Sequence, residues 1–103
     1  MSLGCDLTVQ GVQAVIQLSG RFVFDAHRNF KQATDTALTH DGVREVVVDL
    51  ARVEYLDSSA LGMLLMLKER CEAAGRAVAL RGAAGVVAKV LEVANFNRLF
   101  KLI

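Results

Sequence analysis

The residue types best suited to chemistry stand together in Asp57-Ser58-Ser59, where two hydroxyls follow a carboxylate. This segment lies between a β-branched stretch and an apolar stretch of helical period, so a strand is expected to end and a helix to begin there. Aspartate and serine are favoured N-cap residues, worth about 0.5–2 kcal/mol over alanine, and plain helix capping is the simplest interpretation. One cap needs only one of these side chains, which leaves a hydroxyl free to face solvent.

A hydroxyl at the start of a helix is suited to reversible phosphorylation. The free N–H groups and the dipole of a helix N-terminus favour negative charge, and a phosphoserine carries roughly −1.5 to −2 charges at pH 7. We therefore expect phosphorylation here to change the surface while the helix survives. The carboxylate of Asp57 would repel the phosphate, so the switch need not be a simple ordering event.

Nucleophilic catalysis by Ser58 or Ser59 is the alternative use of these hydroxyls. The G-x-S-x-G elbow is absent, and nothing in the sequence brings His27 or His40 to the serines to complete a triad. We expect both histidines on the surface. The segment 82–85 precedes an expected helix but lacks the lysine and hydroxyl of a P-loop, so it is interpreted as a turn. The sequence favours a protein that is not an enzyme.

Composition and cysteine usage exclude several further classes of function. Cys5 and Cys71 form no CxxC pair and have no metal-ligand spacing, so neither a metal nor a cofactor is expected, and Cys71 is expected to be buried. A net charge of +1 without a basic block argues against direct nucleic-acid binding. No signal-peptide pattern is present, and the longest apolar run, 60–67, is short of the roughly 20 residues that span a bilayer. These features predict a cytoplasmic protein with no direct membrane contact.

The chain is expected to fold as a single domain over residues 1–103, because its length and its 53% hydrophobic content suffice for a core. The continuous β-branched run 46–50 predicts a central strand buried on both faces. The predicted strands are 7–9, 14–18 extended by 18–22, 46–50 and 77–80, with 99–103 as a further candidate and a turn at Gln10-Gly11. The predicted helices are 25–39 with Asp25 as N-cap, 59–74 ended by Gly75, and 86–95. This order predicts an α/β fold with a mixed four- to five-stranded sheet covered by about three to four helices.

The helix predicted over 59–74 has two distinct faces. Helical spacing forms an inward stripe from Ala60, Met63, Leu64, Leu67, Cys71 and Ala74. Leu65 and Met66 then point outward on the side of Gly62, within two turns of the serines. Incidental apolar exposure is common on protein surfaces, but an apolar patch beside a modifiable hydroxyl indicates a partner-binding surface at Gly62, Leu65 and Met66. We expect Leu65 and Met66 to be more exposed than the inward stripe.

Three segments of the chain together resemble one protein family. Val47-Val48-Asp49-Leu50 followed by Tyr55-Leu56-Asp57-Ser58-Ser59-Ala60-Leu61-Gly62 is similar to the signature of STAS domains of the anti-sigma factor antagonist type. Segment 18–22 resembles the first block of that family, and 95–100 its closing segment. The resemblance covers nearly the whole chain in the correct order and implies a single STAS domain.

The resemblance implies a phosphorylation switch. In this family the serine directly after the aspartate accepts the phosphate, which corresponds here to Ser58, with Asp57 and Ser59 as neighbouring switch residues. The implied partners are an anti-sigma factor with serine kinase activity and a PP2C-type phosphatase. The unphosphorylated form binds the anti-sigma factor and so releases a sigma factor; we expect the antagonist to be a monomer. One position departs from the family: its first block has an aspartate where Val23 stands, and the sequence leaves open whether Asp25 takes that place.

A second interpretation is a non-signalling STAS subunit, such as the accessory protein of a lipid-transporting ABC complex. Such a subunit would use the same surface as a constitutive docking face. Phosphorylation separates the two interpretations, because only the first needs a kinase that modifies Ser58 and a partner that senses the change.

Overall fold

The computed structural model describes residues 3–103, which form a five-stranded mixed sheet and three α-helices. The strands, adjacent in the order of their numbering, are β1 (Gly4–Gln10), β2 (Gln13–Phe22), β3 (Glu45–Leu56), β4 (Ala77–Arg81) and β5 (Lys101–Leu102). The helices are α1 (His27–Leu38), α2 (Ser58–Ala73) and α3 (Gly85–Val93), with 3-10 turns η1 (Phe24–Ala26) and η2 (Phe96–Arg98). β1 and β2 are antiparallel and the other neighbours are parallel, which confirms the predicted α/β class.

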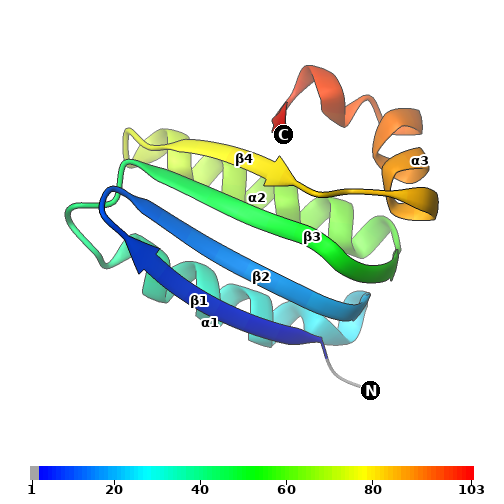
Figure 1. Cartoon of the computed structure of the whole chain (residues 1–103), viewed down its shortest axis with the longest axis horizontal. Helices are drawn as coiled ribbons and strands as arrows, with labels where there is room; N and C mark the ends of the chain where they lie inside the picture. Colours follow the sequence, from blue (N-terminus) through cyan, green and yellow to red (C-terminus); the bar gives the residue numbers. More distant parts are fainter. Residues whose placement is uncertain (1–2) are drawn as a thin grey trace.

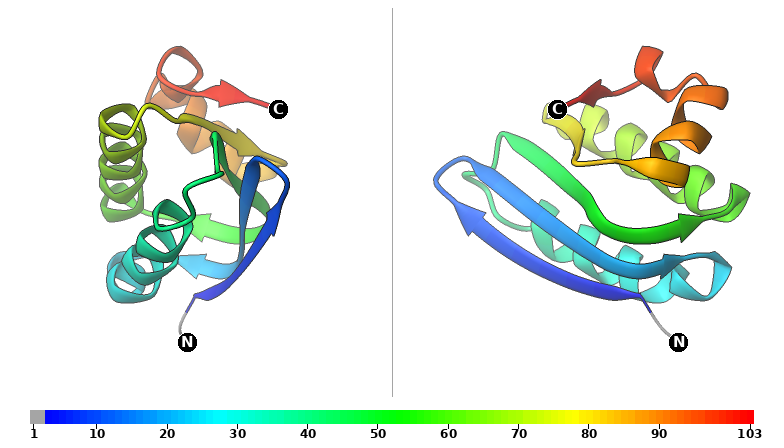
Figure 2. Two further views of the ribbon diagram at one scale, coloured as in Figure 1. Left: turned by 90° about the vertical axis from the view of Figure 1, so that its left-hand side faces the viewer. Right: turned by 45° about the vertical axis from the view of Figure 1, so that its right-hand side comes forward.

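The helices α1 and α2 lie on the same face of the sheet and run side by side (Figures 1 and 2). Both follow a strand of the same parallel pair, so their N-termini lie at the same end of the molecule. α3 and the C-terminal segment lie at one corner of the sheet, where α3 contacts β3 (Figure 1).

The β-branched run 46–50 lies in the middle of the sheet, as predicted. It belongs to β3, the third of five strands, and all its residues are buried. Ile16, Val48 and Leu80 are register partners on β2, β3 and β4, and together they form part of the core under the helices. The core therefore positions the carboxyl ends of β2 and β3, from which η1 and α2 begin.

Asp49, a residue of the family-like motif, has a structural role at a bulge in β3. The register shifts between Gln17 and Ser19 of β2, so that β3 carries an extra residue there. Asp49 accepts hydrogen bonds from the backbone N–H of Ala51 at 2.9 Å and from Arg81 at 3.0 Å. Burial alone would raise the pKa of Asp49, but these two donors outweigh it and hold the pKa below its usual value. Asp49 thus stabilises the bend that precedes the site.

The expected start of the first helix was wrong. Asp25 does not cap α1, because the chain first forms the 3-10 turn η1, and α1 then begins after Ala26 without a side-chain cap. Inside α1, Thr34 is buried although it was not predicted to be, and its hydroxyl donates to the carbonyl oxygen of Phe30 at 2.8 Å. That bond satisfies the hydroxyl, so a polar side chain is tolerated in the core.

Other element boundaries also differ from the sequence prediction. The turn between β1 and β2 is formed by Gly11 and Val12, one position later than expected. α2 ends at Ala73, so Ala74 is an exposed C-cap residue and not part of the inward stripe; Gly75 follows with φ of 71° and ends the helix as predicted. α3 also begins one residue earlier and ends two residues earlier than the predicted 86–95.

Candidate functional site

The connections that follow β2 and β3 meet at one end of the sheet (Figure 1). Phe22 and Leu56, the last residues of the two strands, are register partners. The backbone N–H of Asp57 donates to the carbonyl of Phe22 at 3.3 Å. Functional residues of open α/β sheets lie outside the carboxyl ends of the parallel strands, and the segment Asp57-Ser58-Ser59 lies directly after the carboxyl end of β3.

Asp57 and Ser58 have different roles at the start of α2: Asp57 caps the helix, and Ser58 exposes its hydroxyl. Asp57 has extended backbone angles, and its Oδ1 accepts the backbone N–H of Ala60 at 3.0 Å, as an N-cap does. Ser58 is the first residue of α2 and is exposed, whereas Ser59 is half-buried. The aspartate is thus the cap, and the Ser58 hydroxyl stays at the surface of the first helical turn.

The outward face of α2 carries the expected apolar patch. Leu65 is 36% exposed and Met66 55%, whereas Met63 of the inward face is 6% exposed. Ala60, Leu64, Leu67 and Cys71 are buried as well, so the expectation for the two faces is confirmed. Gly62 is exposed on the same face as Leu65, and a Cβ added to it would meet no atom within 4 Å. The fold itself does not require a glycine there.

The structure adds Phe24 to the surface at this end of the molecule. Phe24 lies in η1, which contacts α2, and it is 70% exposed. Val23 is half-buried, whereas Asp25 is exposed within η1. Asp25 therefore lies in the same short turn beside α2, two positions after Val23. The signal that could have identified Phe24 is a large aromatic residue between a strand end and a helix start.

The two histidines are both exposed and lie at opposite ends of one helix. His27 is the first residue of α1, and His40 follows its C-terminal end. A helix of 12 residues is about 18 Å long, so the two side chains cannot share one site. Within residues 3–103 no group of three or more His, Cys, Asp or Glu side chains is placed to hold a metal ion. The same part of the chain has no helix that is long and apolar enough to cross a membrane.

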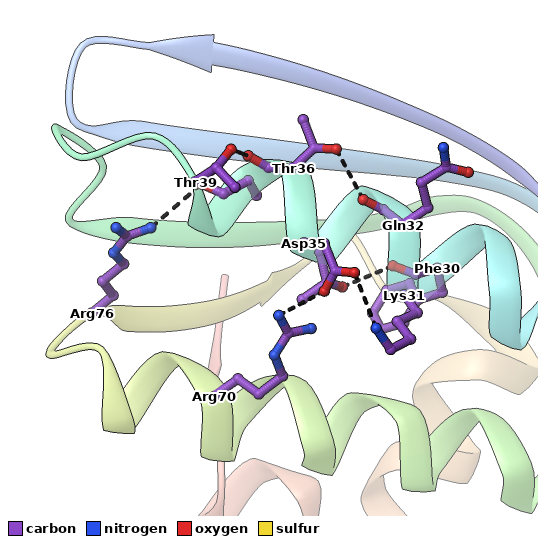
Figure 3. A network of polar contacts seen from close by, with 10 residues as sticks. Phe30, Lys31, Gln32, Asp35, Thr36, Thr39, Arg70 and Arg76 are labelled. Atoms are coloured by element: carbon purple, nitrogen blue, oxygen red, sulfur yellow. Dashed lines mark hydrogen bonds and ion pairs between the residues drawn. The ribbon is translucent and has the colours of Figure 1, made fainter.

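A network of polar contacts links α1 to α2 and to the residues that follow α2 (Figure 3). Asp35 of α1 accepts from Lys31 at 3.1 Å and pairs with Arg70 of α2 at 2.6 Å. The hydrogen bond from Lys31 has the largest effect and that from Arg70 the next, and together they hold the pKa of Asp35 below its usual value. Further along, Arg76 donates to the carbonyl of Ala37 at 3.4 Å. The groove between the two helices is lined by Lys31 of α1 and by Met66 and Arg70 of α2.

Comparison with known proteins gives one family. The family model described as "Mlab, STAS domain" matches residues 5–103 of the chain. A STAS-domain containing protein of Pseudomonas aeruginosa (strain UCBPP-PA14) is 41% identical over 96 residues, which are 92% of each chain.

Solved structures with the same fold include the anti-sigma factor antagonist SpoIIAA of Bacillus, both unphosphorylated and phosphorylated. In each form the TM-score is 0.73 at 21% identity, covering 97% of this chain and 87% or 91% of the SpoIIAA chain. A sulfate transporter family protein from Wolinella succinogenes has a TM-score of 0.78 at 18% identity, over 92% of this chain and 79% of the other. These structures are alike in fold.

Proposed function

The chain belongs to the STAS domain family, and on that premise we propose that it is an anti-sigma factor antagonist whose binding is switched by phosphorylation of Ser58. In the unphosphorylated form it binds an anti-sigma factor and so releases a sigma factor. The anti-sigma factor acts as the serine kinase and a PP2C-type phosphatase restores the binding form. Asp57 and Ser59 flank the switch, and Gly62, Leu65 and Met66 contact the partner.

One observation carries this proposal: Asp57 caps α2, so the exposed Ser58 hydroxyl is not needed for the capping hydrogen bond. A phosphate can be attached to Ser58 without removing the bond from the Ala60 N–H to Asp57. The amides of the first helical turn favour an anion at this position. The folded state therefore tolerates the modification, which is what a reversible surface switch requires.

The apolar face of α2 supplies the reason why phosphorylation would weaken binding. Helical spacing of 100° per residue places Ser58, Gly62 and Leu65 within about 60° of one another around the axis. A partner seated on this face would cover Ser58 as well. A phosphate would then be buried against apolar groups, and a buried charge without a partner costs about 2–5 kcal/mol in association, or at least roughly 30-fold in affinity.

The fold shared with a sulfate transporter family protein favours a second candidate, a STAS subunit of a transport complex such as a lipid-transporting ABC complex. In that function the same face docks constitutively. The two candidates differ in one measurable respect, because constitutive docking requires no kinase for Ser58.

The test combines phosphosite mapping with binding measurements. The chain is incubated with the anti-sigma factor and ATP, and the modified residue is identified by mass spectrometry. Affinity for the anti-sigma factor is then measured by calorimetry for the unmodified and phosphorylated chain, Ser58→Ala and Ser58→Asp. Ser59→Ala is the matched control, since it removes the adjacent, half-buried hydroxyl.

We expect modification at Ser58, full binding by Ser58→Ala and Ser59→Ala, and weakened binding by Ser58→Asp and the phosphorylated chain. Modification at Ser59 alone would refute the assignment of the phosphoacceptor. Binding that is equal for the phosphorylated and unmodified chain would refute the switch and favour constitutive docking.

A further inference from the structure

The groove between α1 and α2 contains a cavity of about 330 Å³, separate from the Ser58 hydroxyl. Its interior is apolar, with walls from Phe30 of α1 and from Met63 and Leu67 of α2, which are all buried. Met66 is 55% exposed and lies among the lining residues, at the surface. The Thr34 hydroxyl also borders the cavity but is bonded to the Phe30 carbonyl, so it does not make the interior polar.

The mouth of the cavity is positively charged. Lys31 of α1 and Arg70 of α2 both line it, and His27 adds a third basic side chain. Asp35 lies beside them, and its two oxygens are already occupied, Oδ2 by Lys31 and Oδ1 by Arg70 (Figure 3). With Lys31 and Arg70 at +1 each and Asp35 at −1, these three side chains carry a net charge of +1.

We propose that this cavity binds a single-chain carboxylate amphiphile of the fatty-acid class. The alkyl chain occupies the apolar interior, and the carboxylate lies at the mouth near Lys31 and Arg70. An ammonium has three donors and a guanidinium five, so both cations keep donors after pairing with Asp35. Asp35 opposes an incoming anion, and the two cations outweigh it.

The volume of the cavity sets the length of chain that fits. Ligand sites in proteins are about 300–1,000 Å³, so this one is at the lower end. An apolar cavity of about 150 Å³ holds benzene, which corresponds to roughly 25 Å³ per carbon and to room here for roughly a dozen carbons. Binding should therefore strengthen with chain length and stop strengthening near twelve carbons.

The experiment is a chemical-shift titration of the ¹⁵N-labelled chain with hexanoate, octanoate, decanoate, dodecanoate and tetradecanoate, each below its micelle concentration. Each further buried CH2 is worth about 0.8 kcal/mol, so affinity should rise by up to about fourfold per methylene and then level off. The shifted amides should cluster in α1 and α2 around the lining residues. Decanol and decyltrimethylammonium, which share the chain length of decanoate, test the head group and should bind more weakly.

Two variants with the same charge change test the mouth. Lys31→Glu should weaken decanoate binding by roughly threefold or more, because a surface pair is replaced by repulsion, and should leave decanol binding unchanged. Lys89→Glu, at an exposed position of α3 that does not line the cavity, should leave both unchanged. The spectrum of each free variant shows whether it is folded.

Equal affinity for decanoate and decyltrimethylammonium would overturn the carboxylate class. Shifts spread over the whole surface, or no saturation with any chain, would overturn the site itself. Since the titration uses the chain alone, these outcomes do not depend on whether Ser58 is phosphorylated or an anti-sigma factor binds.

Discussion

Replacing Gly62 with alanine is expected to stabilise the protein and at the same time to weaken binding of the proposed partner. Gly62 lies inside α2, exposed, and a Cβ at this position would meet no atom within 4 Å. Glycine in a helix interior costs about 0.5–1 kcal/mol relative to alanine. The free protein is therefore less stable than it would be with alanine at position 62. We infer that glycine is present there because a partner approaches the helix backbone closely.

A second glycine in equally open space, Gly75, serves as the control for the size of the stability change. Gly75 also has no atom within 4 Å of an added Cβ, but its φ is 71°, a conformation that side chains rarely adopt. Gly62→Ala should raise the free energy of unfolding by about 0.5–1 kcal/mol, or roughly 2–8 °C in Tm. Gly75→Ala should instead lower the free energy of unfolding by about 1 kcal/mol, because alanine is strained in the positive-φ backbone conformation of Gly75 although the surrounding space is open.

Urea and thermal unfolding measure the stability, and calorimetry with the proposed partner, an anti-sigma factor, measures the binding. Gly62→Leu is the second variant, since a large side chain should block a close contact on this face even though the helix accepts it. A destabilised Gly62→Ala would refute the inference that the fold does not need glycine here. Unchanged binding by Gly62→Leu would refute the close approach and remove Gly62 from the partner surface.

Three further predictions concern stability and thiol reactivity. Asp57→Ala removes the cap of the Ala60 N–H and should lower the free energy of unfolding by about 1 kcal/mol in urea; an unchanged midpoint would contradict the capping role. Asp49→Asn should cost about 1 kcal/mol at pH 7. Because folding lowers the pKa of Asp49, wild type holds this advantage above about pH 4 and loses it in stronger acid, so the two stability curves should converge there. A gap that stays constant down to pH 3 would count against the charged acceptor. Burial raises the pKa of Cys5 to about 11, so iodoacetamide at pH 8 should alkylate it about a hundredfold more slowly than free cysteine; comparable rates would show the thiol to be unperturbed.

The sequence by itself determined the features that depend on neighbours along the chain. The β-branched run 46–50 predicts a strand buried on both faces, and it is the central strand. Helical spacing placed Leu65 and Met66 on the outer face of α2, and the residue types of the segment Asp57-Ser58-Ser59 predicted a helix cap there. That the cap is Asp57 is known only from the structure. These outcomes follow from the pattern of residue types along each element, which the sequence shows directly.

Only the tertiary structure decided the features that join distant segments. Asp25 had the residue type of a cap, but the path from β2 into η1 moved the start of α1 past it and left Phe24 exposed. The partners of Asp49 depend on a bulge and on the register of β4, neither of which is visible in a hydrophobic pattern. The cavity is lined by residues of both α1 and α2, and the Asp35–Arg70 pair beside it joins residues 35 positions apart. Period and propensity describe each helix alone, whereas the space between two helices is set by how all the elements close on one core.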